Sequence, residues 1–177
     1  MLEPFWTTEA PAAAHSAANA LPPVLLERWS RPLLLVHAVL GFTAAFLVAH
    51  HAASAWQEVR GRRAARQLRR FGWMAPTALL LQGAAGLLLY PVYRVRVRFA
   101  HLDAAAPAVA QLFELKEHFG ALSLPLVVAA ALLGRTAPID PVARRAVAAL
   151  SSAGALLVWC ALVIGLYVTA RHPVGLP

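Results

Sequence analysis

Two histidines lie inside long apolar stretches of the chain, where an imidazole could bind a metal ion. His37 is about five residues into the first stretch, and His118 is about six residues into the third. At 1.5 Å per helical residue, both would lie roughly 8–9 Å below the same membrane surface. Imidazoles at one depth on two helices suit the axial ligation of a haem. The residues therefore predict one b-type haem near the outer face, with His37 and His118 as its metal ligands.

Polar residues close to these histidines fit the other parts of such a site. Glu114 lies four residues before His118, on the same helical face, and could orient its imidazole. Arg94 and Arg96 lie with Tyr90 at the same membrane boundary. Arginine forms bidentate bonds with carboxylates, so these two could hold the haem propionates. We expect all four to belong to the cofactor site.

A simpler interpretation needs no cofactor and stays open. His37 would hydrogen-bond to a neighbouring helix, and His118 would be satisfied by Glu114. Glu114, Glu117 and His118 share one helical face and Lys116 points elsewhere. In this interpretation all four would simply flank the span at headgroup depth, with Lys116 snorkelling to the headgroups. A second haem is not expected: His51 shares a helical face with His37, but the inner parts of the other apolar stretches contain no histidine.

Four apolar stretches supply the elements that must position these residues. They cover about 32–55, 73–93, 112–133 and 147–170, and each reaches the roughly 20 residues that span about 30 Å of hydrocarbon. With 60% hydrophobic and 14% charged residues, the composition excludes a disordered chain or a charged soluble module. The single cysteine excludes a disulfide within one chain and a site ligated by several cysteines. We expect an all-α, four-helix transmembrane bundle over residues 32–177.

The segment before the first span differs in character. Residues 1–31 are rich in alanine and proline, and the first 20 contain no lysine or arginine. A secretory signal peptide begins with positive charge, so we expect an uncleaved segment. Val24–Trp29 should form a short interfacial turn with Trp29 at headgroup depth.

The arginines are distributed unevenly between the two sides of the predicted bundle. Nine lie in the links after the first and third spans, and six lie on the other side. Short loops rich in arginine tend to stay in the cytoplasm. We therefore expect a multi-pass protein of the cell inner membrane with both termini in the periplasm. The dense run Arg60–Arg70 favours anionic headgroups over nucleic acid as its partner.

The layout resembles small bacterial four-helix membrane proteins of the copper-resistance D and HemJ-type protoporphyrinogen oxidase group. The residues that carry the resemblance are the VHAVLGF opening with His37, the Arg60–Arg70 stretch and Lys116, within about the first 120 residues. The resemblance implies a bound b-type haem. The KEHFG segment and the Arg94–Arg98 run depart from that pattern.

These patterns favour electron transfer, with membrane quinone or a periplasmic electron carrier as partner. Two alternatives remain open: a non-enzymatic membrane subunit of a larger respiratory or transport complex, and a small metal-handling transporter. The sequence contains no phosphate-binding glycine loop, nucleophile elbow or HExxH pattern. It leaves open whether the protein is an enzyme.

Overall fold

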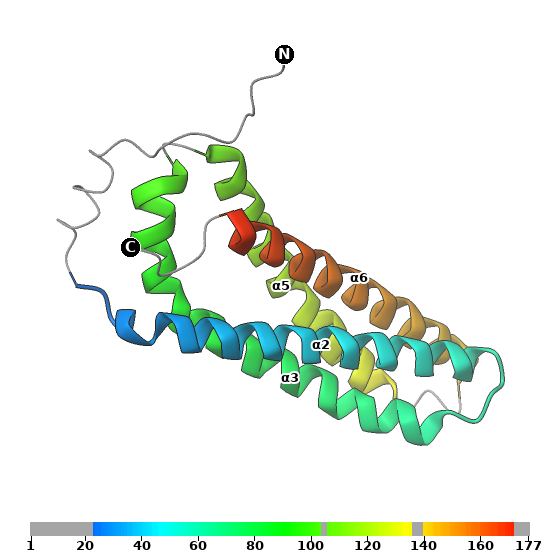
Figure 1. The fold of residues 1–177 in the computed structure, drawn as a ribbon. Coiled ribbons are helices and arrows are strands. Elements are labelled where there is room, and N and C mark those ends of the chain that lie inside the picture. Colours follow the sequence, from blue (N-terminus) through cyan, green and yellow to red (C-terminus); the bar gives the residue numbers. More distant parts are fainter. Residues whose placement is uncertain (1–22, 104–105, 136–139, 172–177) are drawn as a thin grey trace, which may run out of the picture.

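The computed structural model describes residues 23–103, 106–135 and 140–171. Its elements in chain order are η1 (Glu27–Trp29), α2 (Ser30–Val59), α3 (Ala65–Val92), η2 (Tyr93–Leu102), α5 (Pro107–Leu133) and α6 (Pro141–Arg171). The four α-helices pack as a bundle, and each contains a stretch long and apolar enough to cross a membrane (Figure 1). The predicted all-α, four-span fold is confirmed. The expectation for residues 1–20 falls outside the described residues.

The helices extend beyond the apolar stretches that predicted them. α3 begins at Ala65, so Arg66 lies on a helix and not in a loop. The turn before α3 is closed by the Glu58 carboxylate, which accepts a hydrogen bond from the backbone N–H of Ala64. α6 begins with Pro141, and the preceding Asp140 carboxylate accepts a hydrogen bond from a backbone N–H at 2.8 Å. Proline at the first helical position after an acidic cap is a common helix start.

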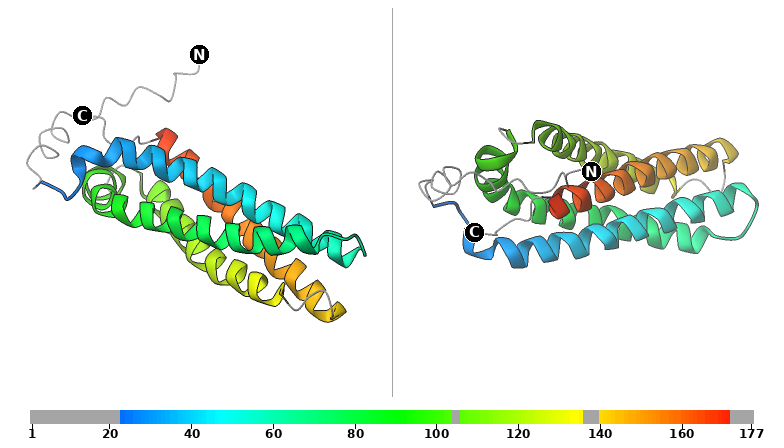
Figure 2. Two further views of the ribbon diagram at one scale, coloured as in Figure 1. Left: turned by 90° about the horizontal axis from the view of Figure 1, so that it is seen from below. Right: turned by 45° about the horizontal axis from the view of Figure 1, so that its top comes forward.

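The two ends of the bundle differ in their connections. The α2–α3 turn, the end of α5 and the start of α6 lie together at one end, here called the arginine end (Figure 1). The elements η1 and η2 lie at the opposite end, here called the η2 end. α2 packs against α3 and α6, and α5 packs against α6 and α3 (Figure 2). Residues near the start of α2 therefore share a level with the end of α3 and the start of α5.

The centre of the bundle is built from small side chains. The main buried cluster contains Ala44, Ala45, Val48, Ala75, Ala78, Leu79, Val127 and Val158. Large apolar side chains lie on the outside: Phe46 is 54% exposed and Leu87 is 75% exposed. Lipid is as apolar as leucine, so these exposed side chains cost nothing in a bilayer. Small interior residues let the helices approach closely and gain dispersion contacts.

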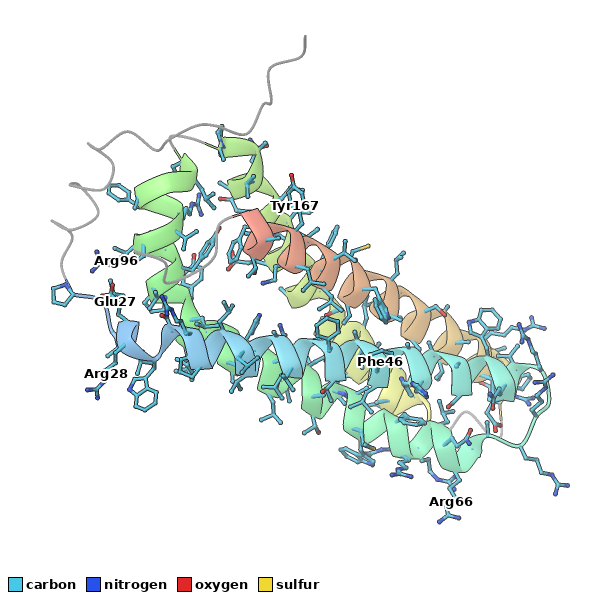
Figure 3. The ribbon with its side chains drawn as sticks, viewed as in Figure 1. Glu27, Arg28, Phe46, Arg66, Arg96 and Tyr167 are labelled. Atoms are coloured by element: carbon cyan, nitrogen blue, oxygen red, sulfur yellow. The ribbon has the colours of Figure 1, made fainter. Side chains whose placement is uncertain are left out.

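A π-helix follows α3 at the η2 end. The stretch YRVRVRF lies within η2. The Tyr93 ring stacks on Phe113 of α5, with ring centroids 3.6 Å apart. Arg96 pairs with Glu27 of η1 at 2.7 Å, and the two side chains lie next to each other in Figure 3. These contacts fasten η2 to both α5 and the segment before α2.

Candidate functional site

His37 lies half-buried on α2 and faces α3. Its Nδ1 lies 3.1 Å from the Gln82 backbone carbonyl, and its Nε2 lies 3.3 Å from the Gln82 side-chain nitrogen. A carbonyl oxygen only accepts hydrogen bonds, so Nδ1 carries the proton and donates it. Nε2 then holds the lone pair, which accepts a hydrogen bond from the Gln82 amide. The ring is fixed in the tautomer that leaves Nε2 as the basic nitrogen.

Gly86 provides the bare backbone that the His37 ring packs against. A Cβ at this position would lie 3.0 Å from His37 Cε1 and 3.4 Å from Nδ1. Any larger residue would therefore push the imidazole away from α3. Gln82, Gly86, Tyr90 and Arg94 are spaced four residues apart, so they run along one side of the helix. The residues that contact His37 and the predicted site residues Tyr90 and Arg94 therefore lie along one side of the chain from α3 into η2.

Tyr90 and Arg94 line a pocket at the η2 end. The pocket has a volume of about 310 Å³, and its other lining residues are Arg98, Phe99 and Asp103. Arg98 is already neutralised, because it pairs with Asp103 at 3.3 Å and with Glu114 at 2.6 Å. Arg94 is exposed and has no ion pair within the part of the chain that the structure describes. The guanidinium of Arg94 is therefore available to an anionic ligand.

Arg96 does not share this role in the structure. It does not line the pocket, and its guanidinium contacts both carboxylate oxygens of Glu27, at 2.7 and 3.0 Å. The predicted pair Arg94 and Arg96 is thus divided between a pocket and a structural ion pair. Residues two apart on a helix point to different sides, which accounts for the division.

Among the described residues, no hydrogen bond joins His118 to His37. His118 is exposed on α5, and its Nδ1 donates a hydrogen bond to the Glu114 backbone carbonyl at 2.7 Å. The expected contact between Glu114 and His118 is present, but the carbonyl makes it and the carboxylate does not. The Glu114 carboxylate instead binds Arg98. The described residues contain no group of three or more histidine, cysteine or acidic side chains that could hold a metal ion.

Lys116 on α5 points towards α6, away from the helical side that carries the exposed His118, as the sequence spacing predicts. A Cβ at Gly165 of α6 would lie 3.2 Å from Lys116 Cε and 3.6 Å from Nζ. The ammonium lies 5.1 Å from the centroid of the Phe113 ring. Lys116 and His118 are two residues apart, about 200° around a helix, so one faces inward when the other faces lipid. This two-residue spacing was the sequence signal that only one of Lys116 and His118 could face the interior.

His51 lies in the centre of the bundle near the arginine end. Its side chain is fully buried. Its Nδ1 lies 3.3 Å from Ser151 Oγ of α6, and its Nε2 has no hydrogen-bond partner among the described residues. A Cβ at Gly72 of α3 would lie 3.5 Å from that Nε2. His51 therefore acts as a core residue that three helices enclose.

The comparisons with known proteins add no family to this description. The chain matches no protein-family model, no curated protein and no solved structure. The class of protein is therefore inferred from the long apolar helices of the described residues. The chain is an integral membrane protein, and the residues that the structure describes form four helices long and apolar enough to cross a membrane.

Proposed function

We propose that the protein binds one b-type haem towards the η2 end of the bundle and transfers electrons, with His37 as an axial ligand. The observation that carries the proposal is the hydrogen bond from His37 Nδ1 to the Gln82 carbonyl at 3.1 Å. Histidines that bind a metal commonly donate their other ring N–H to a backbone carbonyl or carboxylate. This bond fixes the ring orientation and would leave Nε2 as the nitrogen that binds iron.

The surroundings of His37 fit a flat cofactor with two carboxylates. Gly86 has no side chain beside the ring, so α3 adds no bulk there. The Gln82 amide would release Nε2, and its 3.3 Å contact is at the long end of hydrogen-bond distances. Tyr90 and Arg94, one and two turns beyond Gly86, would hold the propionates in the 310 Å³ pocket.

A second protein ligand for the iron would come from α5. His118 was expected there from the sequence, but its ring is exposed and hydrogen-bonded to its own helix. Lys116 faces the interior beside Gly165 of α6, whose added Cβ would lie 3.6 Å from Nζ. A neutral lysine amine can donate a lone pair to iron. The inward direction of Lys116 and the exposure of His118 favour Lys116 as the ligand that α5 would supply.

A bound haem would supply a one-electron carrier at this site. The chain would hold it through His37, orient the imidazole through the Gln82 carbonyl and neutralise the carboxylates through Arg94. The apolar bundle would exclude water from the ring. A site near one membrane surface suits exchange with membrane quinone and with a periplasmic carrier. The arginine distribution supports an inner-membrane protein with periplasmic termini.

The test is a reduced-minus-oxidised absorption spectrum of the detergent-purified chain from haem-supplemented cells. Wild-type protein should show a Soret band, and His37→Ala should lose it. His50→Ala is the matched control, because His50 is exposed and bonded to the Phe46 carbonyl of its own helix at 2.8 Å. Lys116→Met should keep the haem but change its ligand spectrum, and His118→Ala should change neither.

Each contrary result has a definite meaning. A colourless wild-type protein would overturn the haem proposal. If it also co-purified with other membrane proteins, a structural subunit would be the better description. Stoichiometric copper or zinc by elemental analysis would indicate a metal-handling protein. A spectral change in His118→Ala, with Lys116→Met unaffected, would restore the ligand pair expected from the sequence.

A further inference from the structure

The arginine end of the bundle has a large excess of positive charge. Nine arginines and only two carboxylates lie in this region. We call these nine residues the arginine face: Arg60, Arg62, Arg63, Arg66, Arg69, Arg70, Arg135, Arg144 and Arg145. Over residues 23–103, 106–135 and 140–171, none of the nine forms an ion pair with a carboxylate. Most are exposed, and Figure 3 shows Arg66 pointing away from the helices.

The two carboxylates at this end bind the backbone and do not balance the arginines. Glu58 accepts the N–H of Ala64, and Asp140 accepts the N–H of Val142. The opposite end differs, because carboxylates there pair with arginine side chains, as Glu27 does with Arg96. Unpaired positive charge is therefore concentrated at one end of the molecule.

Two tryptophans show that this charge begins at headgroup depth. Trp56 on α2 is 44% exposed and Trp73 on α3 is 63% exposed. Exposed tryptophans gather at the boundary between lipid tails and headgroups. The Arg135 guanidinium lies over the Trp73 ring, 4.4 Å from its centroid. The arginine face thus starts where phospholipid phosphates would lie.

We propose that the arginine face binds anionic phospholipid headgroups of the adjacent leaflet. A guanidinium forms two parallel hydrogen bonds with a phosphate, which an ammonium cannot do, and every basic residue of this face is arginine. A lipid fits better than a free nucleic acid because the charges adjoin the tryptophans at the ends of membrane-crossing helices. Each lysine or arginine near an anionic membrane surface raises the affinity of the protein for that surface by about fivefold.

The experiment measures which lipids the purified protein retains. Protein in mixed micelles of phosphatidylcholine and phosphatidylglycerol is examined by native mass spectrometry. Wild-type chain should retain phosphatidylglycerol in preference to phosphatidylcholine. The double variant Arg62→Gln/Arg63→Gln should lower that preference by about fivefold for each arginine removed. The matched control is Arg28→Gln/Arg31→Gln at the η2 end, which should leave the preference unchanged.

Further measurements separate this proposal from its rivals. Unfolding of each variant in pure phosphatidylcholine checks that the fold is retained. Equal loss of preference in both double variants would overturn the assignment to this end. Inorganic phosphate at millimolar concentration should not displace the lipid; displacement would indicate a free-anion site. Displacement by a short RNA would likewise overturn the lipid assignment.

Discussion

Gly154 on α6 offers a sharp test of how closely the helices pack. It is buried, and a Cβ added there would lie 2.7 Å from Cγ2 of Val127 on α5. Carbon atoms in favourable contact are about 3.5–4.0 Å apart, so α5 and α6 would have to separate by roughly 1 Å. Overpacking of this kind typically costs about 1–3 kcal/mol. Alanine also gains about 1 kcal/mol over glycine as a helix former, which offsets part of that cost.

A second glycine on an exposed face isolates the packing effect. A Cβ at Gly83 would meet nothing within 4 Å, so Gly83→Ala carries only the gain in helix propensity. We expect Gly154→Ala to have a free energy of unfolding about 1–3 kcal/mol below that of Gly83→Ala. Reversible unfolding in mixed detergent–SDS micelles, followed by far-UV circular dichroism, measures this difference.

A rescue variant completes the experiment. Val127→Ala removes the methyl group that the new Cβ would meet, so it should cost less in the Gly154→Ala background than in the wild type. The coupling between the two positions should be about 1–2 kcal/mol. If Gly154→Ala proves as stable as Gly83→Ala, the inferred close approach of α5 and α6 is refuted.

Three further predictions concern the ends and the core. Glu27→Gln should break the ion pair with Arg96 and destabilise the fold by only about 0.2–1 kcal/mol, because both side chains are partly exposed. Faster amide hydrogen exchange in the segment before α2 would reveal the loss of the pair, and high salt should reduce the stability difference between variant and wild type. Asp140→Ala removes the cap of α6 and should lower the free energy of unfolding by about 0.5–2 kcal/mol, whereas Asp140→Asn should recover most of it. His51→Ala should lower the free energy of unfolding by roughly 2–4 kcal/mol, because it leaves a cavity. His51→Met should lower it much less, because methionine fills the volume and removes a nitrogen that has no partner among the described residues. Equal losses in the two variants would contradict the core role of His51.

The fold could be predicted because a bilayer allows few solutions. Every backbone amide in lipid must be bonded within its own segment, so four continuous apolar runs imply four helices. The predicted helices are shorter than the observed ones. Hydropathy reports contact with lipid, whereas the backbone hydrogen bonds of each helix continue into the headgroup region. Arg66 and Arg69 are helical for this reason, although both were assigned to a loop.

The site was only partly predictable, because sequence gives depth along a helix more readily than rotation about it. His37 and His118 were assigned a common depth. α5 is apolar around most of its circumference, so no amphipathic stripe indicates which side faces the bundle. The inward direction of Lys116 emerges only from its packing against Gly165. The π-helical form of η2 also lacks a sequence signal, although its aromatic contact with α5 stabilises it.

The arrangement of small side chains inside and large ones outside reverses the usual mutational tolerance of a globular protein. In a deep mutational scan, positions such as Leu87 should accept almost any apolar residue, since lipid adapts to its shape. Ala45 and Ala75, which have no exposed surface, should reject even one extra methylene group. Among related sequences, the exposed leucines should therefore vary most, and the buried alanines and glycines should vary least.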